Sequence, residues 1–257
     1  MKKNKIVLLV VFLLVIIGLV VVIAKGRTKN EPQVPQEKKK SEIPLDKRPY
    51  LSLTPSSDGH TLTLGVLFPE GVSSFDYKLF YLTDGIQQGW SNTVVKPKTG
   101  ERLVLEDLLL GTCSKMVCKY DKNVEEGEIT IEMEYEKEFG EFSTRFRLYQ
   151  PKTDLLSSAD GNFLFRPKTR TSGYTVVTET IGLPAAVSGT PLANPIGIFS
   201  SEKKEQDGFL TYLISGLSPS SSLLARRSET WEKVTASVKN EVIEATTSAS
   251  PTFVIVK

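Results

Sequence analysis

The sequence has little of what most catalytic and metal sites require. Its 257 residues include one histidine, His60, and two cysteines, Cys113 and Cys118. A single imidazole excludes mechanisms that need two, and two thiolates cannot complete a four-cysteine zinc site. The sequence also contains no Walker motif, no nucleophile elbow and no Asn-x-Ser/Thr acceptor. We therefore expect no metal, no cofactor and no catalytic site.

An excess of one charge is also missing. The chain has 32 Lys plus Arg against 30 Asp plus Glu, a net charge of +2. Nucleic-acid binding by counterion release requires a concentrated basic surface. The composition therefore argues against a nucleic-acid partner.

One long segment lacks charged and polar side chains altogether. Ile6 to Ala24 is a run of nineteen apolar residues, and as a helix it would span about 28 Å, the thickness of a bilayer core. A cleaved signal peptide would end in a small-residue cleavage site, but this run continues directly into Lys25, Gly26 and Arg27. The pattern predicts an uncleaved transmembrane helix at 6–24 that follows a short tail at 1–5, with the lipid bilayer as its partner.

The orientation of this helix is less clearly marked than its existence. Basic residues flank both ends of the apolar run, so the positive-inside rule does not by itself place the C-terminus outside. A large domain that follows a short N-terminal tail is translocated largely regardless of charge. We expect a single-pass protein of the cell membrane with a cytoplasmic N-terminus and an extracytoplasmic C-terminal body.

Residues 25–47 have the composition of a linker. They contain three prolines, no aromatic residue and a run of three lysines at 38–40. Such a segment cannot bury enough apolar surface to fold. It is predicted to be a basic, disordered spacer, although its lysines could also lie on anionic lipid.

Beyond the linker the apolar residues recur with a period of two. Leu62 to Phe68 and Tyr77 to Tyr81 alternate in this way, which is typical of half-buried strands. The clearest pair is Ile129 to Tyr135 and Phe142 to Leu148, joined by a turn at 137–140. We interpret it as a hairpin whose outward faces are acidic on one strand and basic on the other, with Glu132 expected opposite Arg145.

The second half has the same character. Strands are expected around Phe163, at 174–178, 196–199, 209–214 and 253–256, between loops rich in Gly, Pro and Ser, and Trp231 is expected to fill the core. The chain then reads as all-β, with two β-sandwich modules behind the N-terminal helix: an acidic domain at 48–150 and a second domain at 151–257. A single larger sandwich is the alternative.

Two segments carry a resemblance to a known class of proteins. Gly111 to Tyr135 (GTCSKMVCKYDKNVEEGEITIEMEY) and residues 231–256 (WEKVTASVKNEVIEATTSASPTFVIV) resemble parts of singly anchored bacterial surface proteins built from immunoglobulin-like or fibronectin-type-III-like modules. The resemblance implies a bacterial β-sandwich ectodomain and says nothing about a ligand. No cysteine pair has the separation of the intersheet immunoglobulin disulfide, which departs from the antibody-like pattern.

The cysteines are the sharpest local feature. Cys113 and Cys118 enclose four residues, a spacing compatible with a disulfide that closes a tight loop. In an oxidising compartment they should pair, while free thiols or a metal site are the alternatives. Lys115, Met116 and Val117 would then lie at a constrained tip and form a possible contact loop, unless the apolar side chains pack back onto the sheet.

Two classes of function remain open. The first is a membrane-tethered binding or structural module that recognises a protein or glycan of the cell envelope. The second is an envelope polysaccharide hydrolase on a β-fold, which needs two carboxylates at a suitable separation. Acidic residues do cluster beside the cysteine loop, where we interpret them as a solvated surface: Asp121, Glu125, Glu126 and Glu128.

Overall fold

The computed structural model describes residues 43–95, 100, 102–115, 117–135, 138–203 and 205–257. The expected tail at 1–5, the expected membrane helix at 6–24 and most of the expected linker at 25–47 lie outside the described residues, as does Met116. Within the described ranges, no helix is long and apolar enough to span a membrane. The single helical element there is a short 3-10 turn, η1 (Leu45–Lys47).

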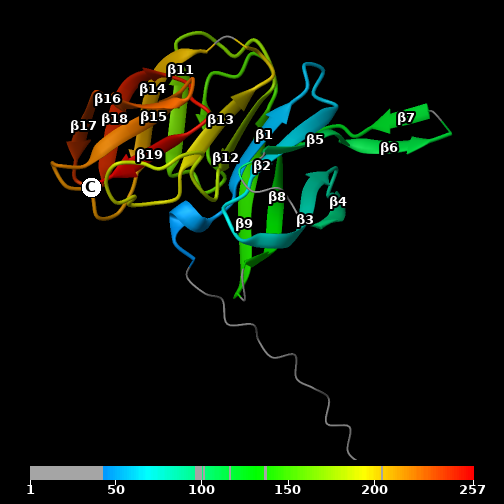
Figure 1. The fold of residues 1–257 in the computed structure, drawn as a ribbon. Helices are drawn as coiled ribbons and strands as arrows, with labels where there is room; N and C mark the ends of the chain where they lie inside the picture. Colours follow the sequence, from blue (N-terminus) through cyan, green and yellow to red (C-terminus); the bar gives the residue numbers. More distant parts are fainter. Residues whose placement is uncertain (1–42, 96–99, 101, 116, 136–137, 204) are drawn as a thin grey trace, which may run out of the picture. The chain divides into compact units, whose positions relative to one another are not determined.

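The last residues of the expected linker, 43–47, are described and belong to the folded structure. Ile43 is buried, and the Arg48 Nε donates a hydrogen bond to the Ile43 carbonyl (2.8 Å). Residues 40–257 form one compact unit, which we call the body. The body is all-β, as predicted (Figure 1).

Three of the sheets carry the cores of the body, and we name them by size and position. The small sheet has the order β1-β2-β5, the large sheet β16-β15-β19-β13-β12-β9-β8-β3-β4, and the C-terminal sheet β10-β11-β14-β18-β17. Every strand pairing in them is antiparallel. The strands of the small sheet are β1 (Tyr50–Pro55), β2 (Thr61–Leu67) and β5 (Arg102–Leu109).

The nine strands of the large sheet come from both halves of the sequence, because β9 pairs with β12. The sheet therefore continues across the expected domain boundary at residue 151. Its strands are β3 (Val72–Thr83), β4 (Ile86–Val95), β8 (Glu126–Tyr135), β9 (Glu138–Tyr149), β12 (Thr175–Glu179), β13 (Ile196–Ser200), β15 (Ser222–Arg227), β16 (Thr230–Val234) and β19 (Phe253–Val256).

The remaining strands form the C-terminal sheet and a separate hairpin. The hairpin is β6 (Gly111–Ser114) with β7 (Val117–Tyr120), and we call residues 111–120 the arm. The strands of the C-terminal sheet are β10 (Leu156–Ser157), β11 (Phe163–Pro167), β14 (Asp207–Leu213), β17 (Ala236–Lys239) and β18 (Val242–Ser248).

Two hydrophobic clusters lie on opposite faces of the large sheet. Val176 belongs to the first cluster, with the small sheet, and Val177 to the second, with the C-terminal sheet. Phe199 and Ile198 divide in the same way on β13. Because successive side chains of a strand point to opposite faces, the small sheet covers one face and the C-terminal sheet covers the other. Strand β12 is consequently buried on both faces.

Most of the strands predicted from alternation are confirmed. The hairpin at 129–148 is formed by β8 and β9, and β2 covers the predicted segment at 62–68 as far as Leu67. The expected pairing of Glu132 with Arg145 is wrong, because the register places Glu132 opposite Glu141 and Glu128 opposite Arg145. Glu132 instead forms an ion pair with Lys78 on β3.

The prediction for Trp231 is also wrong. It lies half-buried on β16, at one edge of the large sheet, and belongs to neither cluster. The Arg226 guanidinium lies 5.7 Å from the centre of its ring. An edge strand has a neighbouring strand on one side only, so the amphipathic indole ring of Trp231 is partly exposed and packs against a cation instead of filling the core.

Candidate functional site

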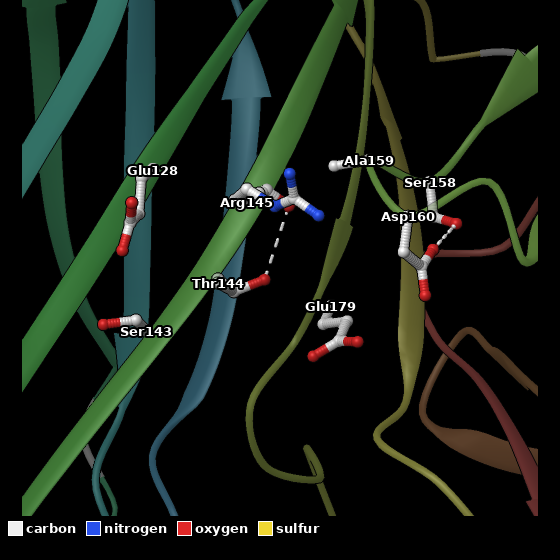
Figure 2. Close-up of a pocket in the computed structure, with 8 residues that line it drawn as sticks. All are labelled: Glu128, Ser143, Thr144, Arg145, Ser158, Ala159, Asp160 and Glu179. Carbon is white, nitrogen blue, oxygen red and sulfur yellow. Dashed lines mark hydrogen bonds between the residues drawn. The ribbon is translucent and has the colours of Figure 1, made fainter.

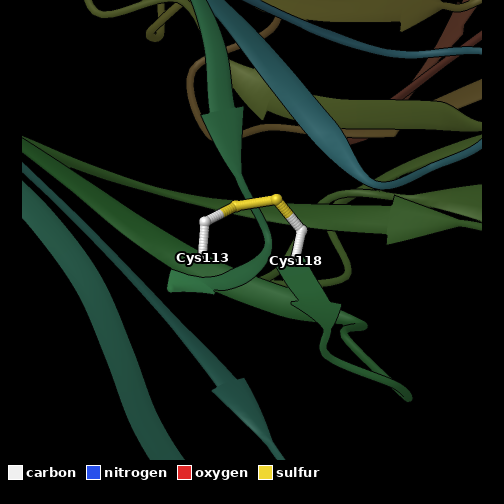
Figure 3. The surroundings of a disulfide bond; sticks show 2 residues. All are labelled: Cys113 and Cys118. Carbon is white, nitrogen blue, oxygen red and sulfur yellow. A yellow bond between two sulfur atoms is a disulfide. The ribbon is translucent and has the colours of Figure 1, made fainter. Parts of the chain in front are cut away.

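The arm is the place where the predicted contact residues lie. Its strands pair only with each other, and Cys113 stands directly opposite Cys118 with a Cα–Cα distance of 4.0 Å. The two cysteines form a disulfide, which links β6 to β7 (Figure 3). The described side chains of the arm are exposed, and the exposed fraction of Val117 is 72%. The alternative in which the tip packs back onto the sheet is therefore wrong for Val117.

The base of the arm is held to the body by backbone and ring contacts. The Leu110 N–H donates to the His60 carbonyl (2.8 Å), and the Tyr120 ring stacks on His60 with the ring centres 3.8 Å apart. Gly111 has φ +152°, and a Cβ at this position would lie 2.2 Å from the Lys119 carbonyl oxygen. Only glycine allows the chain to enter the arm here.

Removing the disulfide should loosen the arm without destabilising the body. Closing so short a loop contributes about 2 kcal/mol by chain entropy, but the described residues of the arm belong to neither hydrophobic cluster. We expect the double variant Cys113→Ser, Cys118→Ser to be cut faster by trypsin at Lys115 and Lys119, with the melting temperature of the body unchanged. Mass spectrometry and calorimetry measure the two effects, and a large fall in melting temperature would contradict this assignment.

A second candidate site was not predicted from the sequence. It is a pocket of about 300 Å³ on the large sheet, beside the loop between β10 and β11 (Figure 2). Its wall includes the buried Thr144 and Ser158 and the half-buried Glu179. Further lining residues are exposed at the rim: Glu128, Ser143, Arg145 and Asp160.

Register explains how these residues meet. Phe80 on β3 is directly opposite Glu128 on β8, and Glu128 is opposite Arg145 on β9. Glu179 immediately follows Thr178, whose hydroxyl donates to the Arg145 carbonyl (3.2 Å). These residues therefore form one row across the strands: Phe80, Glu128, Arg145 and Glu179. The row lies on the same face of the large sheet as the C-terminal sheet.

The two carboxyl groups on one side of the pocket have opposite pKa shifts. Burial raises the pKa of Glu179, partly offset by a hydrogen bond from Asn194 (2.9 Å). Partial burial also acts to raise the pKa of Asp160, but hydrogen bonds from Ser158 and from the Asn162 backbone and side chain outweigh it, so that this pKa is lowered. The pocket therefore holds one carboxyl that favours protonation and one that favours ionisation.

The raised pKa of Glu179 has a measurable consequence. A carboxyl whose pKa is higher in the folded state contributes stability below the unfolded value of about 4.5, and this contribution is lost as the pH rises through the folded pKa. We expect Glu179→Gln, which can still accept the Asn194 bond, to raise the melting temperature by about 2 °C at pH 7. The gain should vanish at pH 3.5, and an equal gain at both pH values would contradict the burial of a charge.

The residues of the pocket could not be predicted as a site, because each of them has only a weak signal in the amino-acid sequence. Alternation does place Phe80 and Arg145 on outward faces, but only the register aligns them with Glu128 and Glu179. Asp160 comes from a loop of the other half of the sequence. In the part of the chain that the structure describes, no group of His, Cys, Asp and Glu is close enough to hold a metal ion. The acidic residues beside the arm do not gather at one site either: Asp121 accepts a hydrogen bond from Tyr81 (2.7 Å), while Glu126 and Glu128 lie on β8.

Comparisons with known proteins add no identity to these sites, since no family model, no curated protein and no solved structure matches the chain.

Proposed function

We propose that this protein is a membrane-tethered, extracytoplasmic binding module of the bacterial envelope, with a body built from immunoglobulin-like or fibronectin-type-III-like sandwiches. The observation that carries the proposal is the arm. Its described residues belong to neither cluster and their side chains face solvent, yet a disulfide links its two strands. A rigid hairpin that does not stabilise its own fold is well suited to contact another molecule.

The chemistry of the arm favours an acidic partner surface. Lys115, Lys119 and the exposed Val117 lie together on the hairpin, and the arm itself contains no acidic residue. Tyr120, with an exposed fraction of 41%, adds an aromatic ring near the base. Cations that surround an apolar contact attract a negatively charged envelope protein or glycan and orient it during association.

The N-terminal segments complete the proposal. The apolar run Ile6 to Ala24 would anchor the chain in the bilayer, and residues 25–42 would act as a basic spacer between the membrane and the body. A disulfide is expected in a compartment that is oxidising, which supports an extracytoplasmic body.

Sedimentation with insoluble envelope fragments tests this function. The body (residues 40–257) is mixed with purified envelope, and the bound fraction is measured for the wild type and for the double variant Lys115→Glu, Lys119→Glu. Charge reversal at the arm should lower the affinity at least tenfold. The control is Lys239→Glu, an exposed lysine at the turn of the β17–β18 hairpin. Equal retention of all three proteins, or no retention of the wild type, would overturn the proposal.

The pocket favours glycoside hydrolysis as a second candidate function. Glycosidases use one carboxyl as an acid and one as a nucleophile or base, with pKa values pushed apart by their surroundings. Glu179 would be the acid and Asp160 the ionised partner. Release of reducing ends from envelope polysaccharide, abolished by Glu179→Gln and by Asp160→Asn, is the expected result, and its absence in the wild type excludes this function.

A further inference from the structure

The pocket is one of two hollows that share a wall. The second hollow, of about 200 Å³, is lined by Phe80, Leu82 and Gln87 and also by Glu128 and Arg145. Glu128 and Arg145 therefore stand between the two hollows and face both. Both residues belong to the row that begins at Phe80 and ends at Glu179, so the two hollows lie side by side across the strands of the large sheet, and together we call them the groove.

The central pair of the groove, Glu128 and Arg145, is available to bind a ligand. Glu128 and Arg145 are directly opposite each other on neighbouring strands, the usual geometry for a cross-strand ion pair. Among the described residues, neither side chain forms an ion pair or a hydrogen bond. The Arg145 guanidinium is directed away from Glu128, toward the Ala159 side of the pocket (Figure 2).

Phe80 supplies an apolar surface at the other end of the row. Its exposed fraction is 36%, on a strand whose neighbouring outward residue Leu82 is 46% exposed. Gly89 lies opposite Phe80, and a Cβ there would come within 2.7 Å of the ring. The absence of a side chain at Gly89 leaves room for the Phe80 ring to lie over the neighbouring strand.

The charges of the groove select the class of ligand. The acidic residues Glu126, Glu128, Asp160 and Glu179 repel an anion, while Arg145 within the row repels an ammonium group that would reach all of them. The described carboxylates are too dispersed for a metal ion. An uncharged molecule rich in hydroxyl groups fits, because a hydroxyl donates to a carboxylate and accepts from a guanidinium.

The dimensions agree with a chain of sugar rings. The row runs from β3 through β8 and β9 to β12, three intervals of about 4.8 Å, or about 14 Å in all. A pyranose ring has polar edges and an apolar face, and the apolar face packs on an aromatic ring. We propose that this groove binds a neutral polysaccharide, with Phe80 as the stacking surface and Glu128 and Arg145 as the central hydrogen-bonding pair.

This inference rests on the proposed function, because it names an envelope glycan as one ligand of the binding module. Native gel electrophoresis of the body through gels that contain dextran, hydroxyethyl cellulose, xylan or galactomannan tests it. We expect at least one of these neutral polymers to retard the wild type. Phe80→Ala and Arg145→Ala should each weaken the binding at least tenfold. Gels with anionic alginate or cationic chitosan should not retard the arm variant Lys115→Glu, Lys119→Glu, which lacks the cations that attract an anionic glycan.

The matched control is Phe209→Ala, an exposed phenylalanine on β14 of the C-terminal sheet, with an exposed fraction of 44%. It should bind as the wild type does, and circular dichroism verifies that each variant is folded. Retardation by none of the neutral polymers, retardation only by alginate or chitosan, or equal retardation of the groove variants would overturn the inference. The arm variant Lys115→Glu, Lys119→Glu separates the two proposals. If this variant loses envelope retention while no neutral polymer retards the wild type, the groove inference fails and the proposed function of the arm stands.

Discussion

Replacing Val177 with aspartate is expected to prevent the body from folding. Val177 is fully buried on β12, the strand that joins β9 to β13 and is covered on both faces. A carboxylate there would be buried without a partner, which costs several kcal/mol, an amount comparable to the total stability of many proteins. We expect loss of the β-sheet circular dichroism signal and accumulation of insoluble protein.

A matched substitution separates the effect of burial from that of the added charge. Leu213→Asp places the same carboxylate on β14, where the exposed fraction of the leucine is 47%. It should leave the melting temperature within about 3 °C of the wild type. If Val177→Asp folds with similar stability, β12 is not enclosed between two hydrophobic clusters.

The second large effect concerns the first cluster. Phe146 is fully buried on β9, and Phe146→Ala should lower the free energy of unfolding by about 4 kcal/mol through lost apolar contact and the cavity left behind. Because β9 and β12 belong to one sheet, the second cluster should lose stability at the same time. We therefore expect a single calorimetric transition, shifted to a lower temperature.

Phe209→Ala serves as the control and should change the free energy of unfolding by less than about 1 kcal/mol. The outcome that contradicts the shared sheet is a scan of Phe146→Ala with two transitions, one of them at the wild-type temperature. That result would instead describe two domains that unfold independently, divided near residue 151.

Alternation predicted the strands better than their partners. Ile129 to Tyr135 and Phe142 to Leu148 show the period of two that a half-buried strand requires, and both form strands. The expected turn at 137–140 was misplaced, since Tyr135 pairs with Glu138. The error shifted Glu132 from Arg145 to Glu141, an even number of residues, so each side chain kept its predicted face while its neighbour changed.

The two-sided burial of β12 had a weaker signal. Thr175 to Thr178 (TVVT) shows no alternation, which is typical of a strand covered on both faces. The sequence composition could not show which sheets pack on the two faces of β12, because the pairing of β9 with β12 joins distant parts of the sequence. The short strands β6 and β7 were expected only as a closed loop around the cysteines.

The two candidate sites differed in how far the sequence could predict them, because one depends on local spacing and the other on strand register. Cys113 and Cys118 are five positions apart, so local spacing together with an expected oxidising compartment was enough to predict their disulfide. The residues of the row lie on four strands and align only through the registers of three strand pairs: Phe80, Glu128, Arg145 and Glu179. Local patterns contain no information about such a row, and neither its ligand nor the groove was expected from the sequence.

Both proposed contacts, at the arm and at the groove, require the body to lie outside the cytoplasmic membrane. Treating intact spheroplasts with trypsin tests this requirement directly, because residues 25–42 contain several basic cleavage positions between the expected anchor and the body. We predict that the protease releases the body into the medium while a cytoplasmic marker stays intact. A full-length chain that resists trypsin until the membrane is permeabilised would contradict the extracytoplasmic location and both binding proposals with it.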